Sequence, residues 1–285
     1  MTKRRLRRMR NRRAALAIAV CALASAPVAA NAADPSTPAG AARTSPASLV
    51  IALGLRDPAM GAGVMRGGEV VLARGFEVEL AKLLARRLGG RVGRFVELRP
   101  AVRLLAGPPG GGGWQLAVAG IERSRPPRAA AGLSAPYLTT DAAVVLRRHL
   151  PRPRRLADLR GRVLCAIRGS SAARAIATVV RPRTAPVLAT RVDRVRELLR
   201  TGACDAALVP AIEAGRFVRG HGRELGPVAG RVESGDGFVV AVAGGIGPDV
   251  AAVDRALARL RSDGTLGRLA RSWLGIDPAR LRTLR

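Results

Sequence analysis

Short apolar segments alternate with amphipathic helical segments along this chain, and the alternation occurs twice. The first half has an apolar run at residues 49–55 before a helical pattern at residues 75–88. The second half has a similar run at residues 163–167 before a helical pattern at residues 192–200. Strands that are apolar throughout are typical of parallel sheets covered by helices on both faces. The sequence therefore predicts an α/β protein of two lobes, each a mostly parallel sheet flanked by helices, with a cleft between the lobes.

The first 32 residues have the composition of a cleavable signal peptide. Positions 3–13 hold eight basic residues, and an apolar run covers positions 14–24. Ala30-Asn31-Ala32 has the small-x-small pattern that a signal peptidase accepts. Residues 33–47 are rich in Ala, Pro, Ser and Thr, which predicts a disordered leader. We therefore expect an exported protein that is periplasmic after cleavage.

The formal net charge of +29 is high, and nearly all of its basic residues are arginine. The segment up to Ala33 holds eight basic residues and no acidic one, and 29 less 8 leaves +21 on the remainder. Nucleic-acid surfaces combine basic residues with aromatic ones, whereas this chain has two Trp, one Tyr and four Phe. We expect no nucleic-acid partner, and we interpret the arginines as a solvated surface that attracts anions or acidic partners.

Two cysteines, Cys165 and Cys204, follow the predicted signal peptide. Their spacing matches no metal motif, and we expect neither a metal nor a cofactor. In an oxidising compartment the two thiols can form a disulfide. The alternative is two separate buried thiols, and the sequence leaves both open.

Several short motifs occur in a fixed order over residues 48–275. They include Gly-Phe-Glu-Val-Glu-Leu-Ala at 75–81, Ser-Ala-Pro-Tyr at 134–137, Asp-Ala-Ala-Leu at 205–208 and Asp-Gly-Thr-Leu at 263–266. In this order they resemble the motifs of family 3 of the bacterial extracellular solute-binding proteins. Those proteins are periplasmic receptors of polar amino acid ABC transporters and have the type 2 periplasmic binding fold.

The resemblance implies two lobes joined by two crossing strands that act as a hinge. The crossings should lie near residues 137–141 and 232–236. The first lobe would hold residues 48–138 and 237–285, and the second lobe residues 139–236. The expected partners are a small polar solute in the interlobe cleft and an ABC permease in the membrane, and the expected protein is a monomer without enzymatic activity.

The family's usual anchors for an amino acid are replaced at three places. Pro127 stands where the family has an arginine that grips the ligand carboxylate, and Arg128 follows one residue later. Glu122 stands where a hydroxyl is usual, and it would favour a cationic group on the ligand. The place of the family's acidic amine ligand is Pro210, and Glu213 lies one helical turn later. The sequence therefore predicts a ligand other than an α-amino acid held in the usual way.

The remaining candidates can donate or accept hydrogen bonds in a cleft. The full set of candidate ligand-binding residues is Asp57, Gly120, Glu122, Ser124, Arg128, Arg168, Ser170, Ser171 and Glu213. Each has a structural alternative. Ser170 and Ser171 are also suited to capping a helix. Glu122 is also suited to pairing with arginines in a solvated loop, and Asp57 is also suited to shaping a turn before Pro58.

Three functions are compatible with the sequence. The first is the solute receptor of an ABC transporter. The second is a receptor-like accessory protein of a periplasmic dehydrogenase of the quinoprotein type, because the usual ligand anchors are replaced. The third is an enzyme like the cyclohexadienyl dehydratases that share this fold, with Glu122 or Glu213 as the acid or base. His149 and His221 lie in arginine-rich loop contexts and are expected at the surface, so we expect no enzyme.

Overall fold

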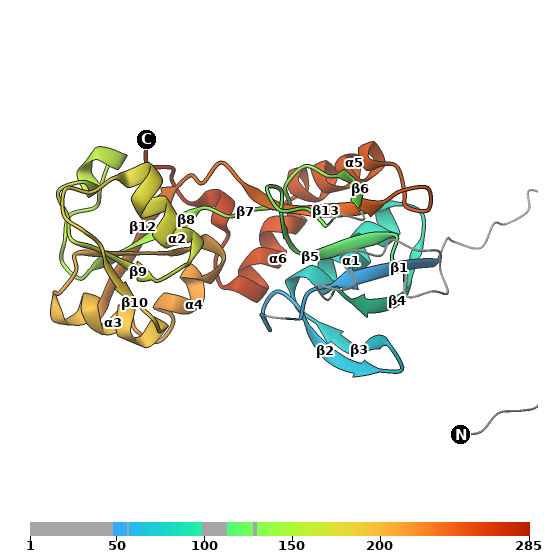
Figure 1. Ribbon diagram of the computed structural model, residues 1–285, viewed down its shortest axis with the longest axis horizontal. Helices are drawn as coiled ribbons and strands as arrows, with labels where there is room; N and C mark the ends of the chain where they lie inside the picture. Colours follow the sequence, from blue (N-terminus) through green and yellow to red (C-terminus); the bar gives the residue numbers. More distant parts are fainter. Residues whose placement is uncertain (1–47, 56, 99–112, 128–129) are drawn as a thin grey trace, which may run out of the picture. The chain divides into compact units, whose positions relative to one another are not determined.

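The computed structural model describes residues 48–55, 57–98, 113–127 and 130–285. The predicted signal peptide and leader (1–47) and the candidate Arg128 lie outside these residues. Within the described residues the chain forms two mixed sheets, each with helices packed against it, and a separate hairpin (Figure 1). No helix in this part of the chain is long and apolar enough to cross a membrane.

The first sheet has the strand order β4-β1-β5-β13-β6, and β7 also pairs with β13. Its strands are β1 (Ser48–Leu53), β4 (Arg91–Glu97), β5 (Leu116–Glu122), β6 (Ala130–Leu133), β7 (Leu138–Thr139) and β13 (Gly237–Ala243). β1 is parallel to its neighbours β4 and β5, whereas β13 is antiparallel to β5, β6 and β7. We call this sheet with its helices the first lobe.

Three helices cover one face of the first sheet: α1 (Phe76–Arg87), α5 (Val250–Ser262) and α6 (Thr265–Leu274). Their apolar stripes pack with the strand side chains in one core, since residues such as Leu84 and Leu257 are fully buried there. α1 begins directly after Gly75, whose φ of 127° is rare for residues with a side chain. A Cβ at Gly75 would lie 2.5 Å from the carbonyl oxygen of Met60, so the close approach that positions the start of α1 requires glycine.

A two-stranded hairpin of β2 (Ala62–Arg66) and β3 (Glu69–Arg74) stands apart from both sheets. Its turn is Gly67-Gly68, and both residues have positive φ. The sequence predicts only a turn here and not the strands on either side. The reason is exposure: Val64 is 47% and Leu72 77% exposed, and Val70 is the one buried apolar side chain of the two strands, so no continuous apolar pattern marks them in the sequence.

The second sheet has the order β10-β9-β11-β8-β12. Its strands are β8 (Ala142–Arg147), β9 (Leu164–Ile167), β10 (Val187–Ala189), β11 (Ala206–Pro210) and β12 (Leu225–Val232). β9 is parallel to β10 and β11, and β8 is antiparallel to β11 and β12. We call this sheet with its helices the second lobe.

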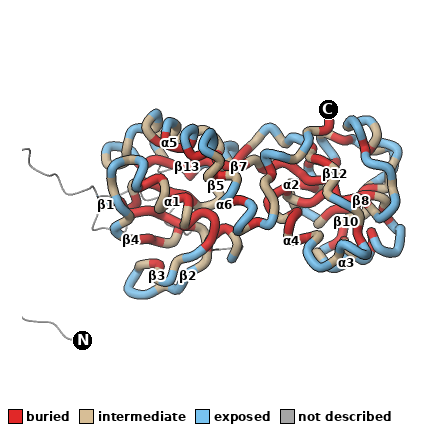
Figure 2. Tube along the Cα trace, turned by 180° about the vertical axis from the view of Figure 1, so that it is seen from behind, coloured by how far each residue is buried: buried red, intermediate tan, exposed pale blue. Residues whose placement is uncertain are grey.

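Both faces of the second sheet are covered. α2 (Ser171–Ala175), which continues as the π-helical turn η3 (Ile176–Val180), packs in one core together with the turn η2 (Leu156–Leu159). α3 (Val192–Thr201) and α4 (Ala214–Val218), which follows the turn η4 (Ala211–Glu213), pack in the other. In both lobes the buried residues follow the strands and the inner faces of the helices (Figure 2).

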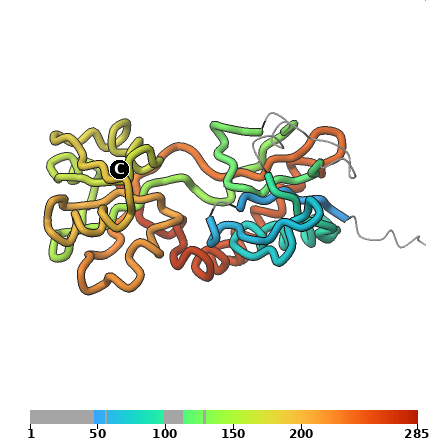
Figure 3. The backbone as a smooth tube through the Cα atoms, turned by 60° about the horizontal axis from the view of Figure 1, so that its bottom comes forward, coloured from blue at the N-terminus to red at the C-terminus, as the bar shows by residue number. Residues whose placement is uncertain are grey.

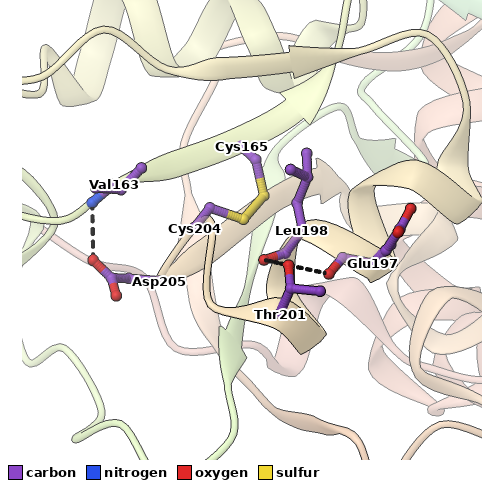
Figure 4. Close-up of a disulfide and its surroundings, with 7 residues drawn as sticks. All are labelled: Val163, Cys165, Glu197, Leu198, Thr201, Cys204 and Asp205. Carbon is purple, nitrogen blue, oxygen red and sulfur yellow. Dashed lines mark hydrogen bonds between the residues drawn. A yellow bond between two sulfur atoms is a disulfide. The ribbon is translucent and has the colours of Figure 1, made fainter.

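Cys165 and Cys204 form a disulfide in the core of the second lobe (Figure 4). Cys165 lies in β9, and Cys204 lies just before β11 rather than within a strand. Their Cα atoms are 6.0 Å apart. The next residue, Asp205, accepts a hydrogen bond from the backbone N–H of Val163, so the disulfide and this hydrogen bond both connect the end of α3 to β9. Of the two alternatives that the sequence leaves open, the structure has the disulfide.

Two segments carry the chain between the sheets, and they lie side by side (Figure 3). The first crossing, residues 136–141, includes β7 and leads into β8, and the second crossing, residues 233–238, leads from β12 into the start of β13. Backbone hydrogen bonds join them, from Tyr137 N to Phe238 O (2.8 Å) and from Thr140 N to Asp236 O (3.3 Å).

The chain after α6 makes a third connection between the lobes. Leu284 is 3% exposed and belongs to the core of the second lobe. The backbone of Arg231 in β12 donates to Arg282 O, accepts from Leu284 N and forms a bridge with Thr283. The predicted division places residues 237–285 in the first lobe, whereas the last residues pack on the second sheet. None of the family motifs lies in this segment, and its few apolar residues show no helical or strand periodicity, so the sequence does not predict this docking.

Candidate functional site

Polar side chains from both lobes surround a cavity of about 220 Å³. Its lining residues are Glu122, Ser124, Arg125, Thr140, Ser171, Arg174, Ala175, Thr178, Val179, Ser234 and Asp236. The set combines the end of β5, both crossings and the α2–η3 helix. We call this the interlobe cavity. It brings together three of the candidates predicted from the sequence, Glu122, Ser124 and Ser171.

The first lobe contributes the turn that follows β5. Glu122 is the last residue of β5 and pairs with Phe238 of β13. The turn closes with a hydrogen bond from Arg125 N to Glu122 O. The hydroxyl of Ser124 donates to Asp236 of the second crossing over 2.5 Å. Burial alone would raise the pKa of Asp236, but this hydrogen bond and the N–H of Gly237 lower it overall, so Asp236 stays ionised and ties the turn to the crossing.

The second lobe contributes Ser171 and Arg174 from the first turns of α2. Ser170 precedes them and caps the helix, because its hydroxyl accepts from Ala173 N over 3.1 Å. Its side chain is thereby used within the helix, as the structural alternative predicts. Arg168 is bound through its backbone N–H to Ala189 O and does not line the interlobe cavity.

The crossings form a part of the lining that is fixed by hydrogen bonds. The hydroxyls of Thr140 and Ser234 lie 2.9 Å apart. Asp141, 2% exposed, accepts from Ser234 N (2.9 Å) and from the guanidinium group of Arg231 (2.6 Å). The buried charge of Asp141 is therefore paired, and the two crossings are held together on the second-lobe side.

A second group of charged residues joins the lobes outside this cavity. Asp57, in the loop after β1, accepts two hydrogen bonds from Arg216 of α4, at 2.9 and 2.8 Å. Burial alone would raise the pKa of Asp57, but these bonds, the charge of Arg216 and the N–H groups of Ala59 and Met60 lower it overall. This bidentate pair has the planar geometry in which arginine binds carboxylates most strongly.

Glu213 belongs to this second group rather than to the interlobe cavity. Burial raises its pKa, the charge of Arg216 opposes the shift, and the charge of Asp57 adds to it. Arg216 pairs with Asp57, and its charge also acts on Glu213. Asp57 and Glu213 were predicted as ligand-binding residues, but neither lines the interlobe cavity.

Gly120 lies within β5 and is part of a buried hydrogen-bond group. Its N–H donates to Glu77 of α1 over 2.6 Å, and the Tyr137 hydroxyl donates to the same oxygen over 2.5 Å. Burial raises the pKa of Glu77 to about 7, against the opposing effect of these two hydrogen bonds. Burial, together with the charge of Glu77, raises the pKa of Tyr137. The φ of Gly120 is +58°, in the left-handed region, which aims its N–H at Glu77.

Sequence reasoning missed three residues that the structure makes prominent. Glu77 is inside a recognised motif, but nothing in the sequence shows that it is buried. Arg174 was not singled out because it is one of many arginines, although its place three residues after Ser171 puts both on one helix face. Arg216 was missed for the same reason. Its spacing of three residues from Glu213 was the one sequence signal that could have identified it.

Solved structures with a similar fold include solute-binding proteins. The L-cystine solute receptor of Neisseria gonorrhoeae, in its unliganded open conformation, aligns with a TM-score of 0.62 and 19% identity over 81% of this chain and 94% of the receptor. The substrate-binding protein of a polar amino acid ABC uptake transporter from Streptococcus thermophilus aligns with a TM-score of 0.60 and 17% identity over 81% of this chain and 87% of that protein.

An ancestral cationic amino acid solute-binding protein aligns with a TM-score of 0.54 and 17% identity over 80% of this chain and 95% of that protein. No family model and no curated protein matches the sequence. At these identities the comparisons establish the fold, and the predicted type 2 periplasmic binding fold is confirmed.

Proposed function

Starting from the type 2 periplasmic binding fold, we propose that this chain is an exported receptor of family 3 that delivers a small polar solute to an ABC transporter. The fold supports the class of protein, because solute-binding proteins share it and periplasmic binding proteins close two domains around their ligand. The predicted signal peptide at residues 1–32 supports export. The partner is a membrane permease, and the receptor acts without chemistry of its own.

The observation that carries the proposal is the interlobe cavity. Its lining comes from both lobes and both crossings, so a solute bound there touches every part that would move when the lobes rotate about the crossings. A volume of about 220 Å³ is below that of pockets for drug-sized ligands. The cavity is therefore suited to a small solute with few carbon atoms.

The charges of the lining favour a solute that carries both signs. Among the described residues, Glu122, Arg125 and Arg174 make no ion pair within 4 Å, whereas Asp236 is already bound by Ser124. A cationic group on the solute would approach Glu122, and an anionic group would approach the guanidinium of Arg174. This arrangement differs from the family's usual amino acid anchors, since Pro127 and Pro210 stand at two of their places.

Thermal unfolding of the purified protein tests the proposal against a panel of amines, carboxylates and zwitterions. A solute that binds only the folded protein raises its stability by about 2.7 kcal/mol at a hundred times its Kd. The variant R174Q should weaken binding of the responding solute about tenfold, because a charge-assisted hydrogen bond contributes on the order of 1.5–3 kcal/mol. R200Q is the matched control, since Arg200 is an exposed arginine of α3 in the same lobe.

A panel without any response would count against the receptor, and co-purification with a periplasmic dehydrogenase would then favour the accessory role. Equal loss of binding in R174Q and R200Q would show that the solute responds to net charge and not to the interlobe cavity. A response that only R174Q loses supports the proposal.

A further inference from the structure

A second cavity, of about 350 Å³, lies beside the first crossing and shares no lining residue with the interlobe cavity. Its walls are Tyr137 and Leu138 of the first crossing, the helix α6, and the segment from Asp277 to Arg280 that leads to the last residues of the chain. We call it the crossing cavity. In Figure 1, α6 is drawn between the two sheets, and it supplies more of the lining residues than any other element.

The crossing cavity is strongly positive. Four guanidinium groups line it, those of Arg261, Arg268, Arg271 and Arg280, against the single carboxylate of Asp277. That carboxylate is largely covered, with a side-chain exposure of 11%. It lies 3.3 Å from Arg271 and 3.7 Å from Arg280, and it also accepts a hydrogen bond from Ala279 N. The only acid in the lining is therefore already shared by two of the four arginines.

The other two arginines are held in place by neutral oxygen atoms. Arg261 donates to the backbone carbonyl of Pro136 in the first crossing, over 2.7 Å. Arg268 donates to Asp263 O and to the hydroxyl of Thr265. Its charge also acts on the carboxylate of Asp263, but that carboxylate is paired at 2.9 Å with Arg87. Among the described residues, no ion pair within 4 Å joins Arg261 or Arg268 to a carboxylate.

The remaining wall is apolar and buried. Tyr137, Leu138, Leu266 and Ala270 are each 8% exposed or less. An apolar wall lowers the local dielectric constant and strengthens the attraction between the guanidinium groups and an anion. Guanidinium forks bind planar or tetrahedral oxyanions through paired N–H groups.

We propose that the crossing cavity binds a small dianion whose charges are carried on oxygen, with Arg261 and Arg268 as its main ligands. Two cations without a carboxylate partner favour a ligand with two negative charges. Inorganic phosphate and a four-carbon dicarboxylate are two sources of this chemistry. The site is separate from the interlobe cavity and does not depend on the proposed receptor function.

Isothermal titration calorimetry of the purified protein at low ionic strength tests this site, with inorganic phosphate and succinate as separate probes and sodium chloride at matched ionic strength as the blank. Saturable binding of one equivalent of either probe is expected, and the probe that binds more tightly identifies the source. The double variant R261Q/R268Q should weaken that binding at least about tenfold. R268Q alone should also weaken it, and this variant leaves the contact of Arg261 with the first crossing intact.

The matched control is R255Q/R259Q, which removes two exposed arginines from α5, outside the cavity, with the same change in net charge. It should keep the affinity of the unaltered protein. Equal weakening in both double variants would overturn the proposal, because the anion would then respond only to net charge. Absence of saturable binding would also overturn it. Loss of binding in R174Q would place the anion in the interlobe cavity instead.

Discussion

The carboxyl group of Glu77 lies at the junction of α1, β5 and the first crossing. It accepts hydrogen bonds from Gly120 N and from the Tyr137 hydroxyl, and it is 1% exposed. Phe76 and Phe238 lie beside Tyr137, with ring centroids 6.1 and 6.3 Å away. A carboxylate surrounded by aromatic rings loses its hydration, and this loss is why burial raises the pKa of Glu77 to about 7.

This shift predicts how stability depends on pH. The pKa of Glu77 is raised from an ordinary value of 4.5, so the folded state binds the proton more tightly than the unfolded state. The resulting stability is complete below about pH 4.5 and is lost as the pH rises through about 7, by roughly 3 kcal/mol in total. E77Q keeps an oxygen that accepts both hydrogen bonds and should lack this loss.

Urea unfolding between pH 4.5 and 8 measures the difference between the unaltered protein and E77Q. E79Q is the control, because Glu79 is a partly exposed acid on the same helix that pairs with Lys82. Parallel pH profiles for the unaltered protein and E77Q would contradict the prediction.

The ion pair between Asp57 and Arg216 is a second residue-level feature with a measurable energy. Both side chains are about 30% exposed, so the pair is screened less than a surface ion pair. A double-mutant cycle with D57N and R216Q should give a coupling energy of about 1–2 kcal/mol. Chemical unfolding of the four proteins measures it. Additive effects of the two substitutions would show that the pair contributes nothing in solution.

At the scale of elements, the strands and helices with a buried apolar face were predictable. α3 is an example: its stripe of Val195, Leu198 and Leu199 is buried, and Gly202 ends the helix in the left-handed conformation. β12 was not predictable, because Gly226, Pro227 and Gly230 interrupt its apolar pattern.

The candidate site was predictable only in part, for a physical reason. The turn after β5 and the start of α2 follow apolar strands, so Glu122, Ser124 and Ser171 could be placed at strand ends. The ion pair of Asp57 with Arg216 depends on how two elements 159 residues apart pack, and no local pattern encodes this. Whether Arg128 reaches the cavity stays a prediction, since it lies outside the described residues.

The disulfide predicts an effect on the second lobe. It closes a loop of 39 residues, for which chain entropy gives a stabilisation of about 2–4 kcal/mol. C165A/C204A should lose this amount in urea unfolding under oxidising conditions, and a reductant should have no further effect on the variant. Two titratable thiols in the unaltered, denatured and unreduced protein would contradict the bond and restore the alternative of separate thiols.

The packing of the last residues, 282–284, on the second lobe predicts that a substitution there affects strands far away in the sequence. L284A removes a buried side chain from the core of the second lobe, and such changes cost about 2–5 kcal/mol. Hydrogen exchange should increase at the amides of β8 and β12, which share this core. R280A is the control, because Arg280 is exposed in the same segment. Unchanged exchange in L284A would show that the last residues are not docked.

At the scale of the whole molecule, the high net positive charge affects the stability of the folded protein. The chain beyond Ala33 carries +21, and self-repulsion of this size destabilises a compact state. Sodium chloride should therefore raise the melting temperature of the protein as it screens the repulsion. A melting temperature that falls with salt would mean that surface ion pairs, such as Arg194 with Glu197 at 2.6 Å, outweigh the repulsion.

The order of the elements in the chain has a consequence for how the protein is made. The first sheet lacks β13, which pairs with β5, β6 and β7, until residue 243 has been synthesised, and the core of the second lobe lacks Leu284 until that residue is present. We therefore expect the nascent chain to stay incompletely folded until both of these segments have been synthesised, a state in which a polypeptide can still be threaded through a membrane pore.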